Sequence, residues 1–198
     1  MKVLVAGATG NTGARLMKTL VSRGHHAIAL VRESSDTSKL PSQAETRLGD
    51  LADLQDGVCD GCDAVIFAAG SGGDTGADLT DKIDRDGAMR LVDLAVDAGV
   101  GRFVMLSSVG AGDPDPDSEL AHYLKAKHDA DEHLKKSSLD YAILRPVALT
   151  DDDGTGKMLF GDDVNVTAKA ARGDVATALA DALESDAWTG KVQLMQSA

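Results

Sequence analysis

Three glycines near the N-terminus constrain the fold of this chain more than any other feature. They stand at positions 7, 10 and 13, directly after the apolar run Lys2–Ala6 and directly before a helical stripe that begins at Ala14. The first glycine permits a tight turn, the second lets backbone N–H groups approach a phosphate, and the third lets the helix pack closely on the strand. The start of that helix adds partial positive charge. The pattern therefore predicts a strand–loop–helix unit that binds the pyrophosphate of a dinucleotide.

Apolar strands alternate with amphipathic helices along the rest of the chain. Most of these strands are unbroken apolar runs, which is typical of strands buried on both faces in a parallel sheet. We expect the strands Lys2–Ala6, Ala27–Val31, Glu45–Leu48, Ala64–Ala68, Arg102–Ser107, Tyr141–Arg145 and Val192–Met195. Helices are expected around 14–21 and 79–98, from Ser118 as N-cap to about Lys136, and from Asp174 as N-cap to about Leu183.

This alternation predicts an α/β fold, a doubly wound parallel sheet of the Rossmann type. We expect a single domain over residues 1–198, with a short C-terminal segment at about 147–198 on the substrate side. Two loops rich in glycine, proline and aspartate, at 110–117 and 150–156, follow strand ends. Ligands bind at that edge of such sheets, so both loops are expected to lie near the site.

Composition and charge exclude several classes of function. The 198 residues include 32 acidic and 20 basic side chains, a net charge of -12, and only 3% aromatic residues. Nucleic-acid binders need a basic surface or stacking aromatic side chains, so no nucleic-acid partner is expected. No apolar run approaches the roughly 18 residues of a membrane span, and the N-terminus does not resemble a signal peptide. We expect a cytoplasmic protein, a monomer or small homo-oligomer, that acts on a small molecule without a membrane partner.

Cys59 and Cys62 form a C-x-x-C pair. One such pair cannot supply four zinc ligands, and no second thioredoxin-like feature accompanies it. We therefore expect Cys62 to pack where the strand Ala64–Ala68 begins, and we expect no metal site.

The segments that follow the second, third and fourth strands are candidates for binding the adenosine half of the dinucleotide. Arg32 follows the second strand and could bind a 2′-phosphate, with Ser34 and Ser35 as extra donors, whereas Glu33 could hold the ribose 2′-hydroxyl of NAD. We favour NADP over NAD. Asp50 could accept a hydrogen bond from the adenine amino group or cap a short helix. The cofactor-contact candidates are Gly7, Thr9, Gly10, Asn11, Thr12, Gly13, Arg32, Asp50, Leu51, Ala68, Ala69, Gly70 and Ser71.

Tyr123 and Lys127 stand four residues apart in an expected helix, so they share one face. A neighbouring ammonium group lowers the pKa of a phenol, which suits a tyrosine for giving or taking a proton. Ser107 and Ser108 end the fifth strand near the same edge of the sheet. The alternative, an exposed tyrosine on a polar helix, stays open.

The chain resembles the short-chain dehydrogenase/reductase superfamily over nearly its whole length. The resemblance rests on the segments GATGNTG, GDL, DAVIFAAG, RFVMLSSVGA and RGDVATAL, and on the stretch from His122 to Pro146. It is to the atypical branch, which is similar to biliverdin/flavin reductases and includes epimerase/dehydratase-like proteins. It implies an NAD(P) cofactor and Ser-Tyr-Lys chemistry, with Ser108, Tyr123 and Lys127 as catalytic residues. Lys127 would also hold the ribose, and Pro146 would pass beside the nicotinamide.

Two positions depart from that resemblance. Val147 stands where a glycine usually follows Arg-Pro, and Asp84 stands where an asparagine is often found. Only about 50 residues follow Pro146, too few for the substrate domain of sugar-nucleotide epimerases. The expected function is an NADP-dependent oxidoreductase of the short-chain type acting on a small carbonyl or flavin-like substrate. The alternatives are an isomerase or dehydratase with retained NAD(P), and a non-catalytic NADPH-binding redox-sensing regulator.

Overall fold

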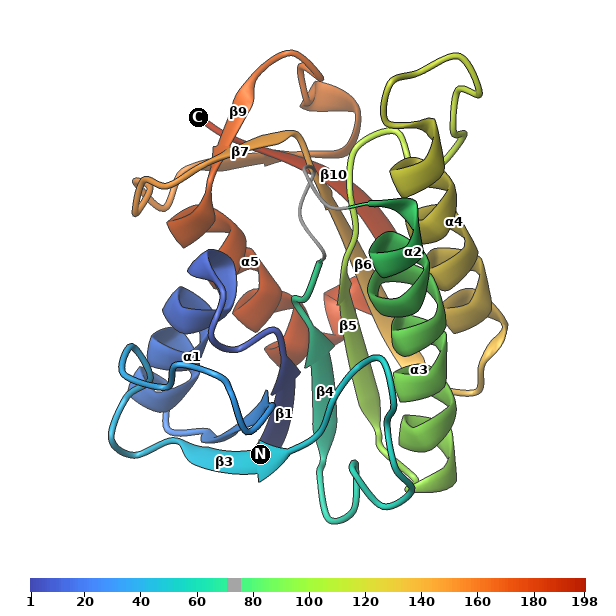
Figure 1. Ribbon diagram of the computed structural model, residues 1–198. Coiled ribbons are helices and arrows are strands. Elements are labelled where there is room, and N and C mark those ends of the chain that lie inside the picture. Colours follow the sequence, from blue (N-terminus) through green and yellow to red (C-terminus); the bar gives the residue numbers. More distant parts are fainter. Residues whose placement is uncertain (71–75) are drawn as a thin grey trace.

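The computed structural model describes residues 1–70 and 76–198, so the contact candidate Ser71 lies outside the described residues. Within them, one eight-stranded sheet has the order β3-β2-β1-β4-β5-β6-β10-β8 (Figure 1). Its strands are β1 (Lys2–Ala6), β2 (His26–Val31), β3 (Glu45–Leu48), β4 (Ala64–Phe67), β5 (Arg102–Leu106), β6 (Asp140–Pro146), β8 (Met158–Phe160) and β10 (Lys191–Ser197). Strand β8 runs antiparallel to β10, and the other neighbouring strands run parallel.

Helices cover both faces of this sheet. The helices α1 (Asn11–Ser22) and α5 (Arg172–Glu184) lie on one face, and α3 (Ala88–Asp97) and α4 (Ala121–Lys136) lie on the other (Figure 1). Helix α3 continues from the short helix α2 (Ala77–Thr80) through the π-helical segment η1 (Asp81–Gly87). The remaining elements are the parallel pair β7 (Ala148–Thr150) and β9 (Lys169–Ala171) and the 3-10 helices η2 (Gly161–Asp163) and η3 (Asp186–Trp188).

The central strands are buried on both faces, as their unbroken apolar sequences predict. In β1, Val3 and Val5 pack in the cluster that contains α1 and α5, while Leu4 and Ala6 pack in the cluster that contains α3 and α4. This alternation follows from the two-residue period of a strand. The doubly wound Rossmann fold in a single domain is confirmed. The strand order reverses beside β1, and such a reversal opens a crevice at the carboxyl ends of the strands.

Two expected helix caps are wrong. Helix α4 begins after Leu120, and Ser118 instead accepts a hydrogen bond from the Leu120 backbone N–H at 3.1 Å. Asp174 lies inside the first turn of α5, where it is buried and accepts hydrogen bonds from Gly156 N at 2.8 Å and from Ser197 Oγ at 2.5 Å. The carboxylate of Asp174 therefore anchors the C-terminal segment instead of capping the helix.

The two cysteines belong to the core. Cys59 and Cys62 are buried and not joined in a disulfide, and the Arg47 guanidinium lies 3.4 Å from Cys62 Sγ. Burial, with Cys62 nearby, raises the pKa of the Cys59 thiol to about 12. A protonated thiol is a poor nucleophile and metal ligand. Among the described residues, no group of three or more side chains is arranged to hold a metal ion, and none of the helices is long and apolar enough to cross a membrane.

Gly13 is the point at which α1 rests on the end of β1. A Cβ atom at this position would lie 2.0 Å from the Gly7 carbonyl oxygen and 2.9 Å from Ala8 Cα. Both neighbours are backbone atoms of the glycine loop and cannot rotate away. The third glycine therefore sets how closely the helix can approach the strand.

We predict that Gly13→Ala lowers the free energy of unfolding by at least about 2 kcal/mol, because a methyl group there forces a backbone shift. The matched control is Gly101→Ala, where the new Cβ would lie 3.6 Å from the Asp63 carbonyl oxygen, an ordinary contact. Urea titration measures both variants. Equal stabilities of the two would contradict the role assigned to Gly13.

Candidate functional site

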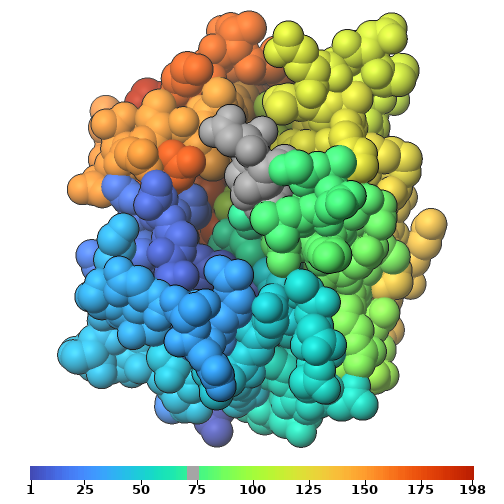
Figure 2. Space-filling view, viewed as in Figure 1, coloured from blue at the N-terminus to red at the C-terminus, as the bar shows by residue number. Residues whose placement is uncertain are grey.

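A cavity of about 580 Å³ lies where the carboxyl ends of β1, β2, β4 and β5 meet α1 and the α2–η1 segment. The space-filling view shows the surface hollowed between the blue N-terminal segment and the green α2–η1 segment (Figure 2). The lining residues are Gly7, Thr9, Gly10, Asn11, Thr12, Leu30, Arg32, Ser35, Gly49, Asp50, Leu51, Ala68, Ala69, Gly70, Leu79, Ile83, Leu106, Ser107, Tyr123, Lys127, Leu149 and Arg172. The cavity thus occupies the crevice that the sheet topology creates.

The glycine loop forms the floor of one end of this cavity. Gly7 has a φ of +80°, and a Cβ atom there would lie 2.6 Å from the Ala69 backbone, so only glycine fits. The Gly10 N–H donates to the Gly7 carbonyl at 3.0 Å and closes the turn. Gly10 is also the N-cap of α1 and has no side chain with which to cap it. The first-turn N–H groups of α1 therefore present a partial positive charge at the cavity, as a phosphate group requires.

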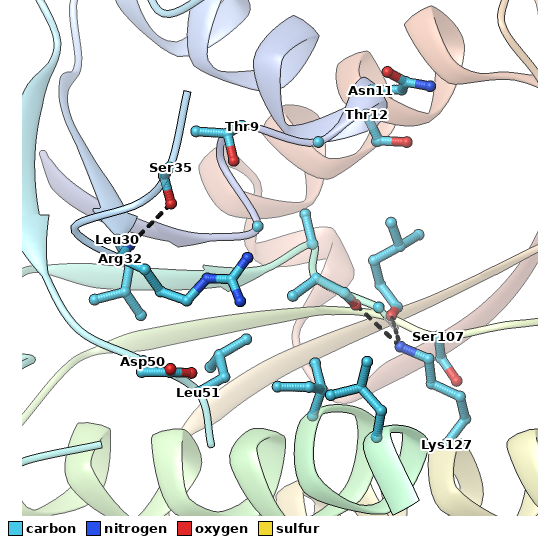
Figure 3. Close-up of a pocket in the computed structure, with 18 of the residues that line it drawn as sticks. Thr9, Asn11, Thr12, Leu30, Arg32, Ser35, Asp50, Leu51, Ser107 and Lys127 are labelled. Carbon is cyan, nitrogen blue, oxygen red and sulfur yellow. Dashed lines mark hydrogen bonds between the residues drawn. The ribbon is translucent and has the colours of Figure 1, made fainter. Parts of the chain in front are cut away.

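Arg32 and Asp50 line the cavity, at the segments where the sequence predicts the adenosine half of a dinucleotide. The close-up shows the Arg32 guanidinium extending into the space between the glycine loop and Asp50 (Figure 3). The Arg32 N–H donates to Ser35 Oγ at 3.0 Å, which fixes the turn after β2. Asp50 accepts a hydrogen bond from the Ala52 N–H at 3.0 Å, so it closes a turn and not the short helix considered above. Glu33 is exposed and does not line the cavity.

Lys127 is a buried cation at the opposite end of the cavity. Its Nζ lies 2.9 Å from Asp84 Oδ1 and donates to the carbonyl oxygens of Ala69 at 3.2 Å and Leu106 at 3.4 Å (Figure 3). It also lies 5.8 Å from the centre of the Tyr123 ring. Burial lowers the pKa of Lys127, but Tyr123 and Asp84 outweigh that effect, so its pKa is raised. Lys127 therefore stays protonated.

The π-helical turn explains how Asp84 reaches this lysine. Asp84 is fully buried within η1, which packs against α4. Gly87, at the end of η1, lies so close to Leu51 that a Cβ atom would be 2.5 Å from the Leu51 carbonyl oxygen. Such π-helical turns inside α-helices are frequent at functional sites. The sequence indicated Asp84 only as a departure from an expected asparagine, and the structure identifies it as the counter-ion of Lys127.

The structure brings Ser107, and not Ser108, to the cavity beside Lys127. Ser107 is buried, and its hydroxyl lies 2.8 Å from Asp131 Oδ2. Arg145 donates to the same oxygen through Nε at 3.0 Å and Nη2 at 2.9 Å. Burial raises the pKa of Asp131, and Arg145 opposes that rise. Because Asp131 Oδ2 already accepts from the guanidinium, Ser107 donates its proton to it and keeps its own oxygen available as an acceptor.

Most of the candidate residues from the sequence meet in this one cavity. Among the described candidates, the residues that do not line it are Gly13, Glu33, Ser34, Ser108 and Pro146. Gly13 packs beneath Gly7, Ser108 is half-buried, and the Pro146 carbonyl accepts from Val109 N at 3.0 Å. The sequence reasoning missed Leu149 and Arg172 as lining residues. Leu149 lies in β7 and Arg172 directly follows β9. Each of these strands has three residues, too few to show a periodic pattern.

The chain is similar in sequence and fold to several known proteins. A family model described as NAD(P)H-binding matches residues 7–186. The protein named uncharacterized sugar epimerase YhfK of Bacillus subtilis is 37% identical over 190 residues, which cover 93% of this chain and 88% of YhfK. A solved Bacillus halodurans structure with the provisional name NAD-dependent epimerase/dehydratase has a TM-score of 0.93 and 37% identity, over 100% of this chain and 94% of its own. The anaerobillin reductase ChuY of Escherichia coli O157:H7 has a TM-score of 0.83 and 26% identity, and the match covers 100% of this chain and 97% of ChuY.

We predict that Lys127→Met lowers the free energy of unfolding by about 3–5 kcal/mol, because it leaves the buried Asp84 without its cation. The control on the same helix is Lys125→Met, since Lys125 is 62% exposed in its pair with Asp129 and an exposed pair contributes only about 0–1 kcal/mol. Urea unfolding of both variants gives the comparison. A loss below about 1 kcal/mol for Lys127→Met would show that the buried pair is not structural.

Proposed function

This chain belongs to the NAD(P)H-binding family, and from that premise we propose that it is an NADP-dependent oxidoreductase of the short-chain type. Its substrate is a small carbonyl compound or a flavin-like acceptor. One observation carries the proposal: the glycine loop, Tyr123 and Lys127 line a single cavity at the crevice of the sheet. A dinucleotide held by the glycine loop would extend toward Lys127, so binding and chemistry would share one space.

The residues present fit a nicotinamide dinucleotide. The backbone at Gly7 and Gly10 leaves room for a pyrophosphate against the start of α1, since no side chain stands there. Arg32 would hold the 2′-phosphate that distinguishes NADP from NAD. Lys127, already bonded to the Ala69 carbonyl, is suited to hold a ribose hydroxyl. When bound, the reduced cofactor supplies a hydride.

Tyr123 is the proton donor in this proposal. It is half-buried and lines the cavity, and the ammonium of Lys127 faces its ring. A fixed positive charge stabilises the phenolate that forms as the proton leaves. Asp84 balances part of that charge, which keeps Lys127 in place as a buried cation and not as a proton carrier. Tyr123 would therefore protonate an oxygen or nitrogen atom of the substrate while the substrate receives the hydride from the cofactor.

Of the two serines at the end of β5, Ser107 is the better candidate for substrate or cofactor contact. It lines the cavity, whereas Ser108 does not. Its proton is engaged by Asp131, so its oxygen would accept a hydrogen bond from an N–H or O–H group of the ligand. The C-terminal segment would close the substrate side, where Leu149 of β7 contributes an apolar contact. The likeness to ChuY, which is named an anaerobillin reductase and whose structure matches all of this chain, supports reduction as the reaction.

A second function is an isomerase or dehydratase that keeps its NAD(P) bound. The epimerase names of YhfK and of the Bacillus halodurans structure favour this alternative. The two functions differ in whether the cofactor is consumed. Steady consumption of NADPH with a carbonyl or flavin panel supports the oxidoreductase, whereas tightly retained cofactor with no net consumption supports the isomerase. Tight binding with neither activity, and capture of a protein partner, would support a redox-sensing regulator.

We predict that Arg32→Ala weakens NADPH binding selectively, by about 1.5–3 kcal/mol, because a charge-assisted contact with the 2′-phosphate is lost. NADH binding should change little. Calorimetric titration of both cofactors measures the difference, with Glu33→Gln as a neighbouring control that should leave NADPH binding unchanged. Equal affinities of the unmodified protein for NADPH and NADH would contradict the assignment of Arg32.

We predict that Tyr123→Phe lowers turnover by about 10²–10⁴-fold and leaves cofactor affinity nearly unchanged, because only the acid–base group is removed. The control is Tyr141→Phe, since Tyr141 of β6 is half-buried against the core and does not line the cavity. Turnover is measured as NADPH consumption with the substrate found in the panel. Unchanged turnover of Tyr123→Phe would exclude this tyrosine as the proton donor.

A further inference from the structure

Arg172 reaches the cavity from a part of the chain remote from the glycine loop. It begins α5, directly after β9, and lines the cavity together with Gly10, Asn11 and Thr12. Its Nη1 lies 3.0 Å from Asp151 Oδ1. Asn11 Nδ2, at the start of α1, donates to that same oxygen at 3.1 Å. A carboxylate from the acidic loop is therefore held jointly by an arginine and by the first residue of the phosphate-binding helix.

The acidic loop, defined here as residues 150–156, is anchored at its base. The buried carboxylate of Asp174 accepts from the Gly156 N–H at 2.8 Å, and the Gly173 N–H donates to the Asp152 carbonyl at 3.1 Å. Gly154 has a φ of +78°, and a Cβ atom there would lie 2.2 Å from Asp174 Oδ1. These contacts fix the loop on the start of α5. The position of Asp151 beside Arg172 is thus built into the fold.

The same loop is tied to α1 from the other side. Arg15 donates through Nε to Asp153 at 3.0 Å and through Nη2 to the Asp151 carbonyl at 2.5 Å. Two arginines, Arg15 and Arg172, thus face three consecutive aspartates where the glycine loop meets the C-terminal segment. Arg172, unlike Arg15, lines the cavity and is within reach of a ligand there.

The pair of Arg172 and Asp151 is suited to exchange. The Asp151 side chain is 69% exposed, and an ion pair with so exposed a partner contributes only about 0–1 kcal/mol. A pyrophosphate carries more charge than a carboxylate and accepts two parallel hydrogen bonds from a guanidinium. A pyrophosphate on the start of α1 would therefore compete successfully with Asp151 for Arg172.

We propose that Arg172 binds the pyrophosphate of the cofactor and that Asp151 is the internal anion that it releases on binding. This inference rests on the proposed function, because it supposes that a dinucleotide occupies the cavity. The pyrophosphate is common to NADP and NAD, whereas the 2′-phosphate assigned to Arg32 is not. Arg172 therefore contributes to affinity for both cofactors, and Asp151 opposes the binding of both.

Calorimetric titration with NADP and NAD tests the proposal on the unmodified protein and four variants. Arg172→Ala should lower the affinity for both cofactors by a similar factor, roughly 10- to 100-fold. Asp151→Asn should raise the affinity for both cofactors by a few-fold. In the Arg172→Ala background Asp151→Asn should lose part of that effect, because no pair is left to break. Lys169→Ala, an exposed lysine on the neighbouring β9, should leave both affinities unchanged.

Each result has a defined meaning. Unchanged binding by Arg172→Ala, or loss of NADP binding alone, overturns the pyrophosphate assignment. Weaker or equal binding by Asp151→Asn overturns the exchange, and this variant changes only an exposed side chain, so it tests the proposal even where Arg172→Ala fails to fold. An unmodified protein that binds neither NADP nor NAD overturns the proposed function itself, and the two failures are thereby distinguished.

Discussion

The close approach of three backbone segments at Gly7 is the constraint on which the site depends. Gly7 ends β1 in a left-handed conformation, the Ala69 backbone after β4 packs against it, and Gly13 of α1 packs beneath it. Neither of the two glycines tolerates a Cβ atom. The contact sets the width of the crevice where the strand order reverses, and it leaves the start of α1 open to an anion. The rest of the cavity is built around this fixed end.

The part of the cavity around Lys127 depends on buried charges that compensate one another. Lys127 of α4 pairs with Asp84 of η1, and Asp131 of α4 pairs with Arg145 of β6, so both pairs join α4 to another element. Burying an ion pair gains little stability over apolar packing, because both ions lose their hydration. What it provides is a fixed orientation: Lys127 toward the Tyr123 ring, and Ser107 with its oxygen available. Such an arrangement is typical of a site that must place polar atoms accurately.

The sequence predicts most of the fold because the signals are local. Unbroken apolar strands and a glycine loop between a strand and a helix each lie within a few residues, and the structure bears out the doubly wound sheet that they indicate. The sequence resemblance implies Ser108, whereas Ser107 lines the cavity, because a sequence does not show which of two adjacent side chains faces Asp131. Nor does it place Asp174, because that carboxylate binds partners 18 and 23 residues away. Three-residue strands such as β7 and β9 carry too little pattern to predict.

Because the net charge is -12, an anionic cofactor must be attracted by positive groups that lie close to it in the site. At physiological salt, charges separated by more than about 8 Å are largely screened, so the distant aspartates matter less than those at the site. Around the glycine loop, Arg15 and Arg172 face the acidic loop, and Arg32 lines the cavity just after β2. Two of these arginines are thus already engaged by carboxylates of the chain itself. An anionic ligand that binds Arg172 would compete with Asp151 for it, and this competition favours ligands that, like a pyrophosphate, carry more charge than a single carboxylate.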